Sequence, residues 1–213
     1  FNNLLYGGEG IILVSGPTGS GKTTTLYSTL NKLEKPDINI VTIEDPIEFD
    51  LENINQAQVN TKSGVTFAAA LRSILRQDPD IIMVGEVRDE ETVELAIRAA
   101  LTGHLVFSTI HTNDAASGFA RLLNWDIEPF LISSTVKGIL AQRLVRRICE
   151  NCKEEYEITD REVALLKIDK KKFKKTFRGK GCLSCRNSGY RGRLGLYELL
   201  VVDENISELV LNE

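Results

Sequence analysis

The stretch "GIILVSGPTGSGKT", from Gly10 to Thr23, decides the expected fold. Its first part is a short apolar run closed by a glycine, which is typical of a buried parallel strand. The remainder fits the phosphate-loop pattern G-x-x-x-x-G-K-[ST] in full and leads into a predicted helix from about Lys22 to Glu34. A strand, a glycine-rich loop and a helix in this order predict a nucleotide-binding P-loop protein. The alternative is a glycine-rich turn followed by a chance Lys-Thr pair.

This loop is expected to bind the phosphates of a nucleotide through its backbone. Glycines let the chain turn its N–H groups toward phosphate oxygens, and the helix N-terminus adds partial positive charge. Lys22 is expected to reach the β- and γ-phosphates, and the Thr23 hydroxyl is expected to coordinate Mg²⁺. The predicted nucleotide-binding residues are Gly16, Pro17, Thr18, Gly19, Ser20, Gly21, Lys22, Thr23 and Thr24.

Beyond the loop, short apolar strands alternate with segments of helical periodicity. We predict strands at 38–44, 81–84 and 105–109, and helices at about 67–76, 90–101 and 129–141. Asn113 or Asp114 is placed to cap a further helix, and "ISELVLNE" (Ile206 to Glu213) has the pattern of a helix start. The alternation predicts an α/β fold, with a mainly parallel sheet and helices on both faces.

Composition limits the classes of function. The sequence has 213 residues, of which 42% are hydrophobic, and its net charge of −4 disfavours a protein that coats nucleic acid. The basic tracts "QRLVRR" (Gln142 to Arg147) and "KKKFKK" (Lys170 to Lys175) are interpreted as solvated faces or local basic patches. We find no apolar run of membrane-spanning length and no secretory signal. Because the sequence begins at Phe1, we expect a fragment of a longer protein.

Acidic residues follow two predicted strands. Glu44 and Asp45 end one, and Glu86 follows Gly85 in "DPDIIMVGEVRD". In an open α/β sheet, ligands bind beyond the carboxyl ends of the strands, so these acids are expected to lie near the phosphate loop. Glu86 is the first candidate to orient or deprotonate the attacking water, and Glu44 is a candidate for the water or the metal shell. The alternative is that both acids merely end strands.

An aspartate often stands where Gly85 stands here. We expect the glycine to let the backbone turn, so that Glu86 faces the γ-phosphate. The two histidines, His104 and His111, flank the predicted strand 105–109. His111 is a candidate to sense the γ-phosphate or a neighbouring subunit, and the alternative for each histidine is a structural role.

The four cysteines form two C-x₂-C pairs, Cys149 with Cys152 and Cys182 with Cys185. Two such pairs supply four thiolates for a tetrahedral Zn²⁺ ion, although the spacer between them is longer than usual. Disulfides or redox chemistry are the alternatives. Four thiolates leave no open coordination position, so we expect a structural role for the metal.

Several stretches appear in the order of one known family: "GPTGSGKTTTLY", "TIEDPIEF", "LRSILRQDPDIIMVGEVRD", "TGHLVFSTIHTNDA", "AQRLVRRIC" and the cysteine pairs. Together they resemble the C-terminal ATPase domain of type II secretion ATPases of the E-protein type and of type IV pilus assembly ATPases. The resemblance implies a RecA-like core at 1–148, a zinc module at 149–189 and a return to the core at 190–213.

The resemblance also assigns roles to residues. It implies that Glu44, Asp45 and Glu48 lie in an Asp box, that Gly85 and Glu86 end an atypical Walker B motif, and that His104 and His111 belong to a His box. Glu86 would be catalytic. Arg72 and Arg76 would meet nucleotide across a subunit interface.

At the level of the whole protein, the resemblance implies a hexameric ATPase using Mg²⁺-ATP on the cytoplasmic face of the bacterial inner membrane. Its partners would be the inner-membrane platform and membrane-anchoring proteins, without nucleic acid. The family's preceding half domain, which supplies further arginines, is absent from the sequence. We therefore expect this chain to bind nucleotide, to hydrolyse it weakly and not to form a robust hexamer alone.

Two other functions stay open at this stage. One is a nucleic-acid motor or recombination-type ATPase whose cysteines form a zinc ribbon, which would show DNA-stimulated activity steeply weakened by salt. The other is a nucleotide switch that does not hydrolyse ATP, in which loss of Glu86 would change nothing measurable.

Overall fold

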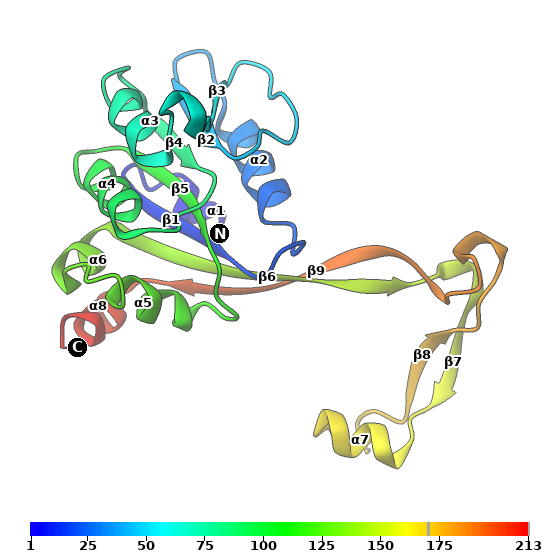
Figure 1. Cartoon of the computed structure of the whole chain (residues 1–213). Helices are drawn as coiled ribbons and strands as arrows, with labels where there is room; N and C mark the ends of the chain where they lie inside the picture. The colour runs from blue at the N-terminus through cyan, green and yellow to red at the C-terminus, as the bar shows by residue number, and fades with distance from the viewer. Residues whose placement is uncertain (170, 213) are drawn as a thin grey trace. The chain divides into compact units, whose positions relative to one another are not determined.

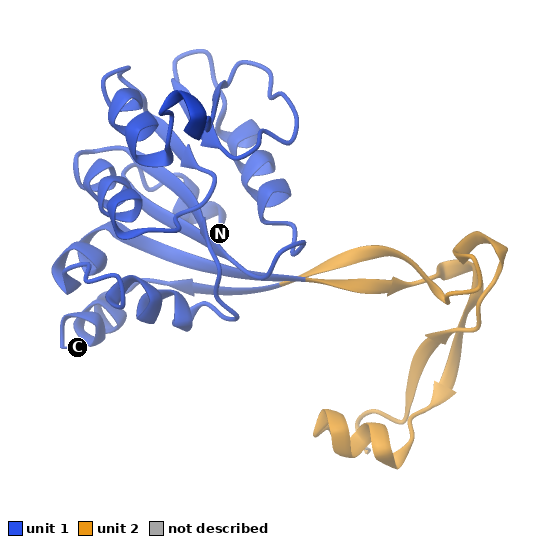
Figure 2. Ribbon diagram, in the orientation of Figure 1, with its two compact units in different colours: residues 1–143, 197–213 blue, residues 144–196 orange. Residues whose placement is uncertain are grey.

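The computed structural model describes residues 1–169 and 171–212. It divides into two compact units, the first made of residues 1–143 with 197–213 and the second of residues 144–196 (Figures 1 and 2). Two long strands, β6 (Val136–Ile148) and β9 (Tyr190–Val201), contribute to both units. Lys170 of the predicted basic tract and Glu213 lie outside the described residues.

The first unit is built on a seven-stranded sheet with the order β3-β2-β4-β5-β1-β6-β9. Its first six strands in this order pair in parallel, and β9 returns beside β6 in the opposite direction (Figure 1). Every residue of β1 and β5 is buried, as their apolar sequences predict. The remaining strands are β1 (Gly10–Ser15), β2 (Ile40–Glu44), β3 (Asn55–Gln58), β4 (Ile81–Val84) and β5 (Leu105–Ile110).

Helices cover both faces of this sheet, which confirms the predicted fold class. Ile12 and Val14 of β1 pack on one face with residues of α1 and α2, whereas Ile11 and Leu13 pack on the other face with α3 to α6 and α8. None of the described helices is long and apolar enough to cross a membrane. The helices are α1 (Asn2–Leu5), α2 (Lys22–Leu33), α3 (Phe67–Ile74), α4 (Glu90–Leu101), α5 (Ala116–Leu123), α6 (Pro129–Thr135) and α8 (Glu204–Leu211).

The helix predicted at 129–141 is wrong in its second half. α6 ends at Thr135, and residues from Val136 onward form β6, which pairs in parallel with β1 up to Ser15 and Ala141. A short apolar run has the same sequence appearance in a buried helix and in a strand buried on both faces, so periodicity alone does not distinguish them. The short polar strand β3 and the long strand β9 were also not predicted. The N-cap position of α5 is occupied by Ala115, which makes no side-chain cap, whereas Asp114, one residue earlier, accepts the N–H of Ser117 through its carboxylate at 2.7 Å.

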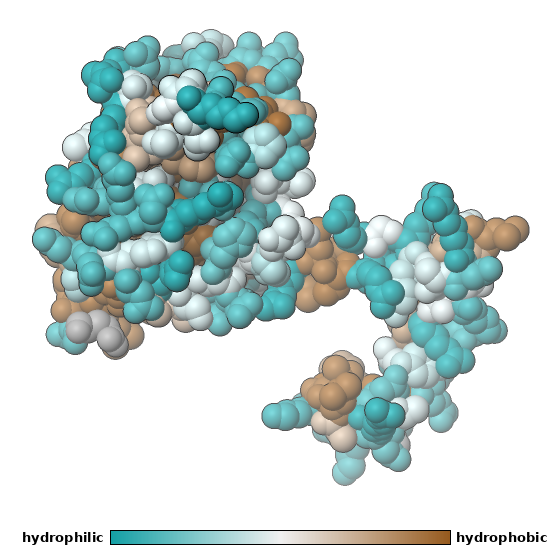
Figure 3. Space-filling model, viewed as in Figure 1, coloured by the Kyte–Doolittle hydropathy of each residue, from teal (hydrophilic) through white to brown (hydrophobic). Residues whose placement is uncertain are grey.

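The second unit contains an antiparallel pair, β7 (Lys153–Glu157) with β8 (Lys175–Gly179), and the helix α7 (Asp160–Leu166). Thr159 and Glu162 form a capping box that starts this helix. Ile158 is the one buried side chain among the described residues of this unit apart from cysteines. The α7 end shows an apolar surface (Figure 3), where Leu165 is 79% exposed. A hydrophobic core therefore contributes little to holding this unit together.

Candidate nucleotide and metal sites

The phosphate loop connects the carboxyl end of β1 to the first turn of α2. Gly16, Gly19 and Gly21 all have positive φ angles, and Gly21 is the left-handed residue that starts α2. Glycine is required at position 16, since a Cβ there would lie 2.4 Å from the Gln142 carbonyl oxygen. Pro17, Thr18 and Gly19 are exposed at the tip of the loop. The loop thus has the backbone shape that the sequence predicts for a cradle of N–H groups.

Lys22 folds back over this loop. Its Nζ donates to the carbonyl oxygens of Gly16 at 2.8 Å and of Pro17 at 3.2 Å. Burial lowers the pKa of the Lys22 ammonium, and the negative charge of Glu86 opposes that shift. The Thr23 hydroxyl has no hydrogen-bond partner among the described residues. The Lys22 ammonium is therefore held by two backbone carbonyl oxygens, and a bound anion would take their place. The Thr23 hydroxyl is available to a ligand.

Glu86 is the acid that the structure brings to the phosphate loop. Its side chain is only 15% exposed, and its carboxylate forms an ion pair with Arg88 and lies 3.4 Å from Nε2 of His111. His111 follows β5 and Glu86 follows β4, which is the neighbouring strand in the sheet. Glu86 and His111 therefore lie together beyond the carboxyl ends of two neighbouring parallel strands, which is where ligands bind in an open α/β sheet.

Gly85 permits a close approach of two strands. Its N–H donates to the Ile43 carbonyl at 2.8 Å, and a Cβ on Gly85 would lie 3.3 Å from that oxygen and 3.4 Å from Glu44 Cα. Its φ angle is not among the positive values. Gly85 is therefore needed because a side chain would have too little space beside β2. It is not needed for the backbone turn that we expected from the sequence.

Glu44 lies in a buried network of neutral donors. Only 3% of this residue is exposed, and its carboxylate accepts the Tyr27 hydroxyl, the Thr42 hydroxyl at 2.6 Å and Nε2 of Gln56 at 3.0 Å. The same Tyr27 hydroxyl accepts the N–H of Glu48 at 3.3 Å. Burial and the bond to Glu44 raise the pKa of Tyr27 to about 12. These contacts join the helix after the phosphate loop to the segment that follows β2.

The structure places three other predicted residues away from this cluster. The Arg72 guanidinium pairs with Glu91 of α4, and Arg76 donates to the Arg72 carbonyl at 2.7 Å. Both arginines are exposed, and none of their described contacts involves the phosphate loop. His104 precedes β5, at the opposite end from His111, and its Nδ1 lies 2.9 Å from the Ala99 carbonyl at the end of α4. The two histidines therefore do not form one site.

The four cysteines form a compact cluster in the second unit. Their sulfur atoms all lie within 4.8 Å of one another, and the Sγ atoms of Cys149 and Cys182 are 3.9 Å apart. Cys185 Sγ lies 3.8 Å from the sulfurs of both Cys152 and Cys182. These separations are far longer than a disulfide bond of about 2.05 Å. A zinc ion with four bonds of about 2.3 Å would have sulfur–sulfur edges of about 3.8 Å, so the residues fit a four-thiolate metal site.

Backbone N–H groups also point at these sulfurs. The N–H groups of Cys182 and Gly189 lie 3.2 Å and 3.3 Å from Cys185 Sγ. Gly179 and Gly189 touch so closely that a Cβ on either would overlap the other's backbone. Donors of this kind stabilise the negative charge of a thiolate ligand. The cluster is therefore arranged for anionic sulfur.

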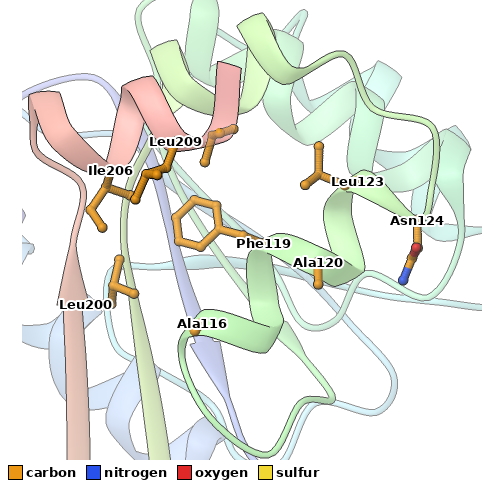
Figure 4. A pocket seen from close by; sticks show the side chains of 9 residues that line it. Ala116, Phe119, Ala120, Leu123, Asn124, Leu200, Ile206 and Leu209 are labelled. Carbon is orange, nitrogen blue, oxygen red and sulfur yellow. The ribbon is translucent and has the colours of Figure 1, made fainter. Parts of the chain in front are cut away.

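Two of the hollows on the first unit have mainly apolar surfaces. A groove of about 450 Å³ between α5 and α8 is lined mainly by apolar side chains such as Phe119, Leu123 and Leu209 (Figure 4). It contains no titratable side chain and no residue of the phosphate loop. A second hollow, of about 560 Å³, lies beside α2 and is lined by Thr24, Thr25, Tyr197 and Leu199 among others. Only the second is next to the predicted nucleotide site.

Sequence reasoning gave no role to three residues that contact the site. All three stand within the stretches that carry the family resemblance. Arg88 pairs with Glu86, two residues before it, and Gln142 reaches Ser20, 122 positions away in the chain, contacts that only the structure shows. Tyr27 has the pattern of an ordinary apolar position of α2, and nothing in the sequence indicates that its hydroxyl reaches Glu44.

The fold and the site define a class of protein. A parallel sheet that carries a phosphate loop after β1 and a carboxylate after β4 is a RecA-like P-loop nucleotide-binding core. Within that class, the chain belongs to the family described as type II/IV secretion system protein, which it matches over residues 1–213.

The type II secretion system ATPase E of Vibrio cholerae is 54% identical over 213 residues, which are 100% of this chain and 42% of that protein. The type IV pilus assembly ATPase PilB of Myxococcus xanthus is 52% identical over 206 residues, 95% of this chain and 36% of that protein. The crystal structure of the pilus retraction motor PilT with bound ADP has a TM-score of 0.74 and 35% identity, covering 99% of this chain and 52% of that one. The chain thus spans about two-fifths of the length of these curated relatives.

Proposed function

We propose that this chain is the nucleotide-binding part of an ATP-hydrolysing motor that serves a type II secretion or type IV pilus assembly machine. The observation that carries the proposal is the cluster of Lys22, Glu86 and His111 around a complete phosphate loop. The names of the relatives support the assignment to ATP, and the ADP in the PilT structure supports an adenine nucleotide.

In this proposal the backbone of residues 16–24 holds the phosphates, and Lys22 leaves the loop carbonyls to bind them. The Thr23 hydroxyl would hold Mg²⁺, which neutralises charge on the phosphates when bound. Glu86 orients and deprotonates the attacking water, and Glu44 supports the metal shell from its buried position. The hollow beside Thr24 has aromatic and aliphatic walls that suit a planar base.

Catalysis in the whole protein would use more than one subunit. Arg72 and Arg76 are exposed and are proposed to face nucleotide on a neighbouring subunit of a hexamer. A trans arginine is worth on the order of 10³–10⁵ in rate in other P-loop enzymes, so this chain alone would hydrolyse ATP weakly. The hexamer would work at the cytoplasmic face of the inner membrane against platform and anchoring proteins.

The four-cysteine cluster is proposed to hold a structural Zn²⁺ ion. The observed sulfur separations fit a ZnS₄ tetrahedron, and the second unit has too small a core to hold its shape by apolar packing. Metal analysis of purified protein tests this. About one zinc ion per chain is expected, and free titratable thiols without metal would refute it.

Glu86→Gln in the full-length protein tests the motor. We expect MgATP to bind as tightly as to the wild type, while hydrolysis falls about 100-fold or more, because a positioned general base contributes about 10²–10⁴. Glu52→Gln, the same change at an exposed position, is the control and should leave turnover unchanged. Unchanged turnover in Glu86→Gln would refute the catalytic role. Activity that depends on added DNA would instead favour a nucleic-acid motor.

A further inference from the structure

The phosphate loop can bind phosphate tightly only if its N–H groups point outward before the ligand arrives. If a backbone peptide has to rotate on binding, the affinity for the ligand falls, because part of the binding free energy is used to order the loop. Contacts on the protein-facing side of the loop, which fix these peptides, therefore affect phosphate binding. The Gln142 side chain makes two hydrogen bonds there, to Ser20 of the loop and to Thr25 of α2.

Gln142 lies on β6, beside the point where β1 becomes the phosphate loop. Residue 141 pairs with Ser15, so Gln142 stands next to Gly16. The backbone carbonyl oxygen of Gln142 occupies the space that a side chain at position 16 would need. The residue is only 3% exposed. A buried primary amide is expensive unless its donors and acceptor are paired.

Both ends of this amide are paired with the loop and its helix. Nε2 donates to the Ser20 carbonyl oxygen at 2.6 Å, and Oε1 accepts the Thr25 hydroxyl at 2.7 Å. A carbonyl only accepts, so the NH₂ group has to face Ser20 and the amide orientation is fixed. One side chain thus connects buried Ser20 of the phosphate loop to the first turn of α2.

The bond to the Ser20 carbonyl has a consequence for the next N–H. In a planar trans peptide, the carbonyl of one residue and the N–H of the following residue point in opposite directions. Gln142 holds the Ser20 carbonyl toward the interior of the protein, so the Gly21 N–H points the opposite way, away from Gln142. Gly21 also starts α2, where the helix N-terminus favours an anion.

We propose that Gln142 is a positioning residue for phosphate binding, which holds the Ser20–Gly21 peptide in the orientation that presents the Gly21 N–H to the ligand. This inference rests on the proposed nucleotide-binding function. Gln142 itself touches no phosphate and acts through the Ser20 carbonyl. The hydrogen bond from Thr25 fixes the orientation of the Gln142 side-chain amide.

Gln142→Met tests the inference in this chain, because methionine has similar length and apolar bulk but neither hydrogen bond. The ligands are MgATP and Mg²⁺-pyrophosphate, since pyrophosphate binds without any contribution from a base. We expect the Kd for both to rise by about tenfold, the cost of losing a well-oriented buried hydrogen bond. Gln77→Met, at an exposed glutamine with no side-chain hydrogen bond among the described residues, should leave both Kd values unchanged.

A purely structural role of Gln142 would give a different pattern. Ile139→Val removes a buried methylene from the same strand and should lower stability with less than about a twofold change in either Kd. The amide resonance of Gly21 gives a local readout: in Gln142→Met it should shift in the free protein and respond less to pyrophosphate. Equal affinity in the folded variant, or an equal loss of affinity in Ile139→Val, would overturn the proposal.

Thr25→Val is the second variant, which tests the same clamp if Gln142→Met does not fold. It removes only the hydroxyl that Oε1 accepts, and a Kd increase of about two- to threefold with a shifted Gly21 resonance is expected. A wild-type Gly21 resonance and affinity in Thr25→Val would overturn the inference. Failure of the wild-type chain to bind pyrophosphate would instead refute the proposed function.

Discussion

Replacing Tyr27 with phenylalanine would remove one hydroxyl from the network around Glu44 and leave the rest of the side chain in place. The ring is fully buried and packs edge-on against Phe49, with ring centroids 4.7 Å apart, so its apolar contacts survive the change. The hydroxyl donates to the Glu44 carboxylate and accepts the Glu48 N–H. We expect a loss of stability with no cavity in the core.

The magnitude follows from the partners of this hydroxyl. A hydrogen bond to a charged group contributes about 1.5–3 kcal/mol, and the cost lies in the upper part of this range because the carboxylate left behind is buried. Thr42 and Gln56 still donate to Glu44, so the carboxylate keeps part of its stabilisation. We therefore expect a loss of about 2–3 kcal/mol, equivalent to a melting temperature lower by about 4–12 °C for a domain of this size.

Urea unfolding followed by the fluorescence of Trp125, the one tryptophan of the chain, measures this loss. Tyr6→Phe, at a residue that is 61% exposed, is the matched control and should cost nothing measurable. The raised pKa of Tyr27 adds a pH test, because its contribution is complete below the unfolded value of about 10 and is lost as pH rises toward 12. A loss below about 0.5 kcal/mol at neutral pH would refute the assigned network.

Three further predictions concern other parts of the molecule. Gly85→Ala would push β4 away from Ile43, cost about 1–3 kcal/mol in urea unfolding and reduce hydrolysis by moving Glu86; unchanged stability would contradict the close approach. Removal of zinc by a strong chelator should expose the amides of residues 149–190 to hydrogen exchange while the buried strands β1 and β5 stay protected, and protection of both regions would contradict a metal-held unit. His104→Ala should lower stability by about 0.5–1.5 kcal/mol without changing the Kd for pyrophosphate, and a changed Kd would place His104 in the site after all.

The phosphate loop and the cysteine pairs could be predicted from the sequence, because the structure of each motif depends mainly on residues that are close together in the chain. The strand Gly10–Ser15, the loop and α2 are consecutive, so their order alone predicted a phosphate-binding turn, and the structure has each of these elements in place. The two C-x₂-C pairs likewise predicted a four-sulfur cluster, which the structure contains. Runs of apolar residues gave less information, and the error at Val136–Ala141 shows that burial on both faces hides the difference between helix and strand.

The sequence by itself determined the fold class, the phosphate loop and the cysteine cluster, because each of these is encoded by residue type and short spacing. Only the tertiary structure decided that Gly85 is needed for space beside β2, that His104 lies apart from His111, and that Gln142 holds the loop. The bonds of Gln142 join residues 117 and 122 positions apart in the chain. Such contacts form only when the sheet places β6 next to β1, and this order follows from the packing of the whole core.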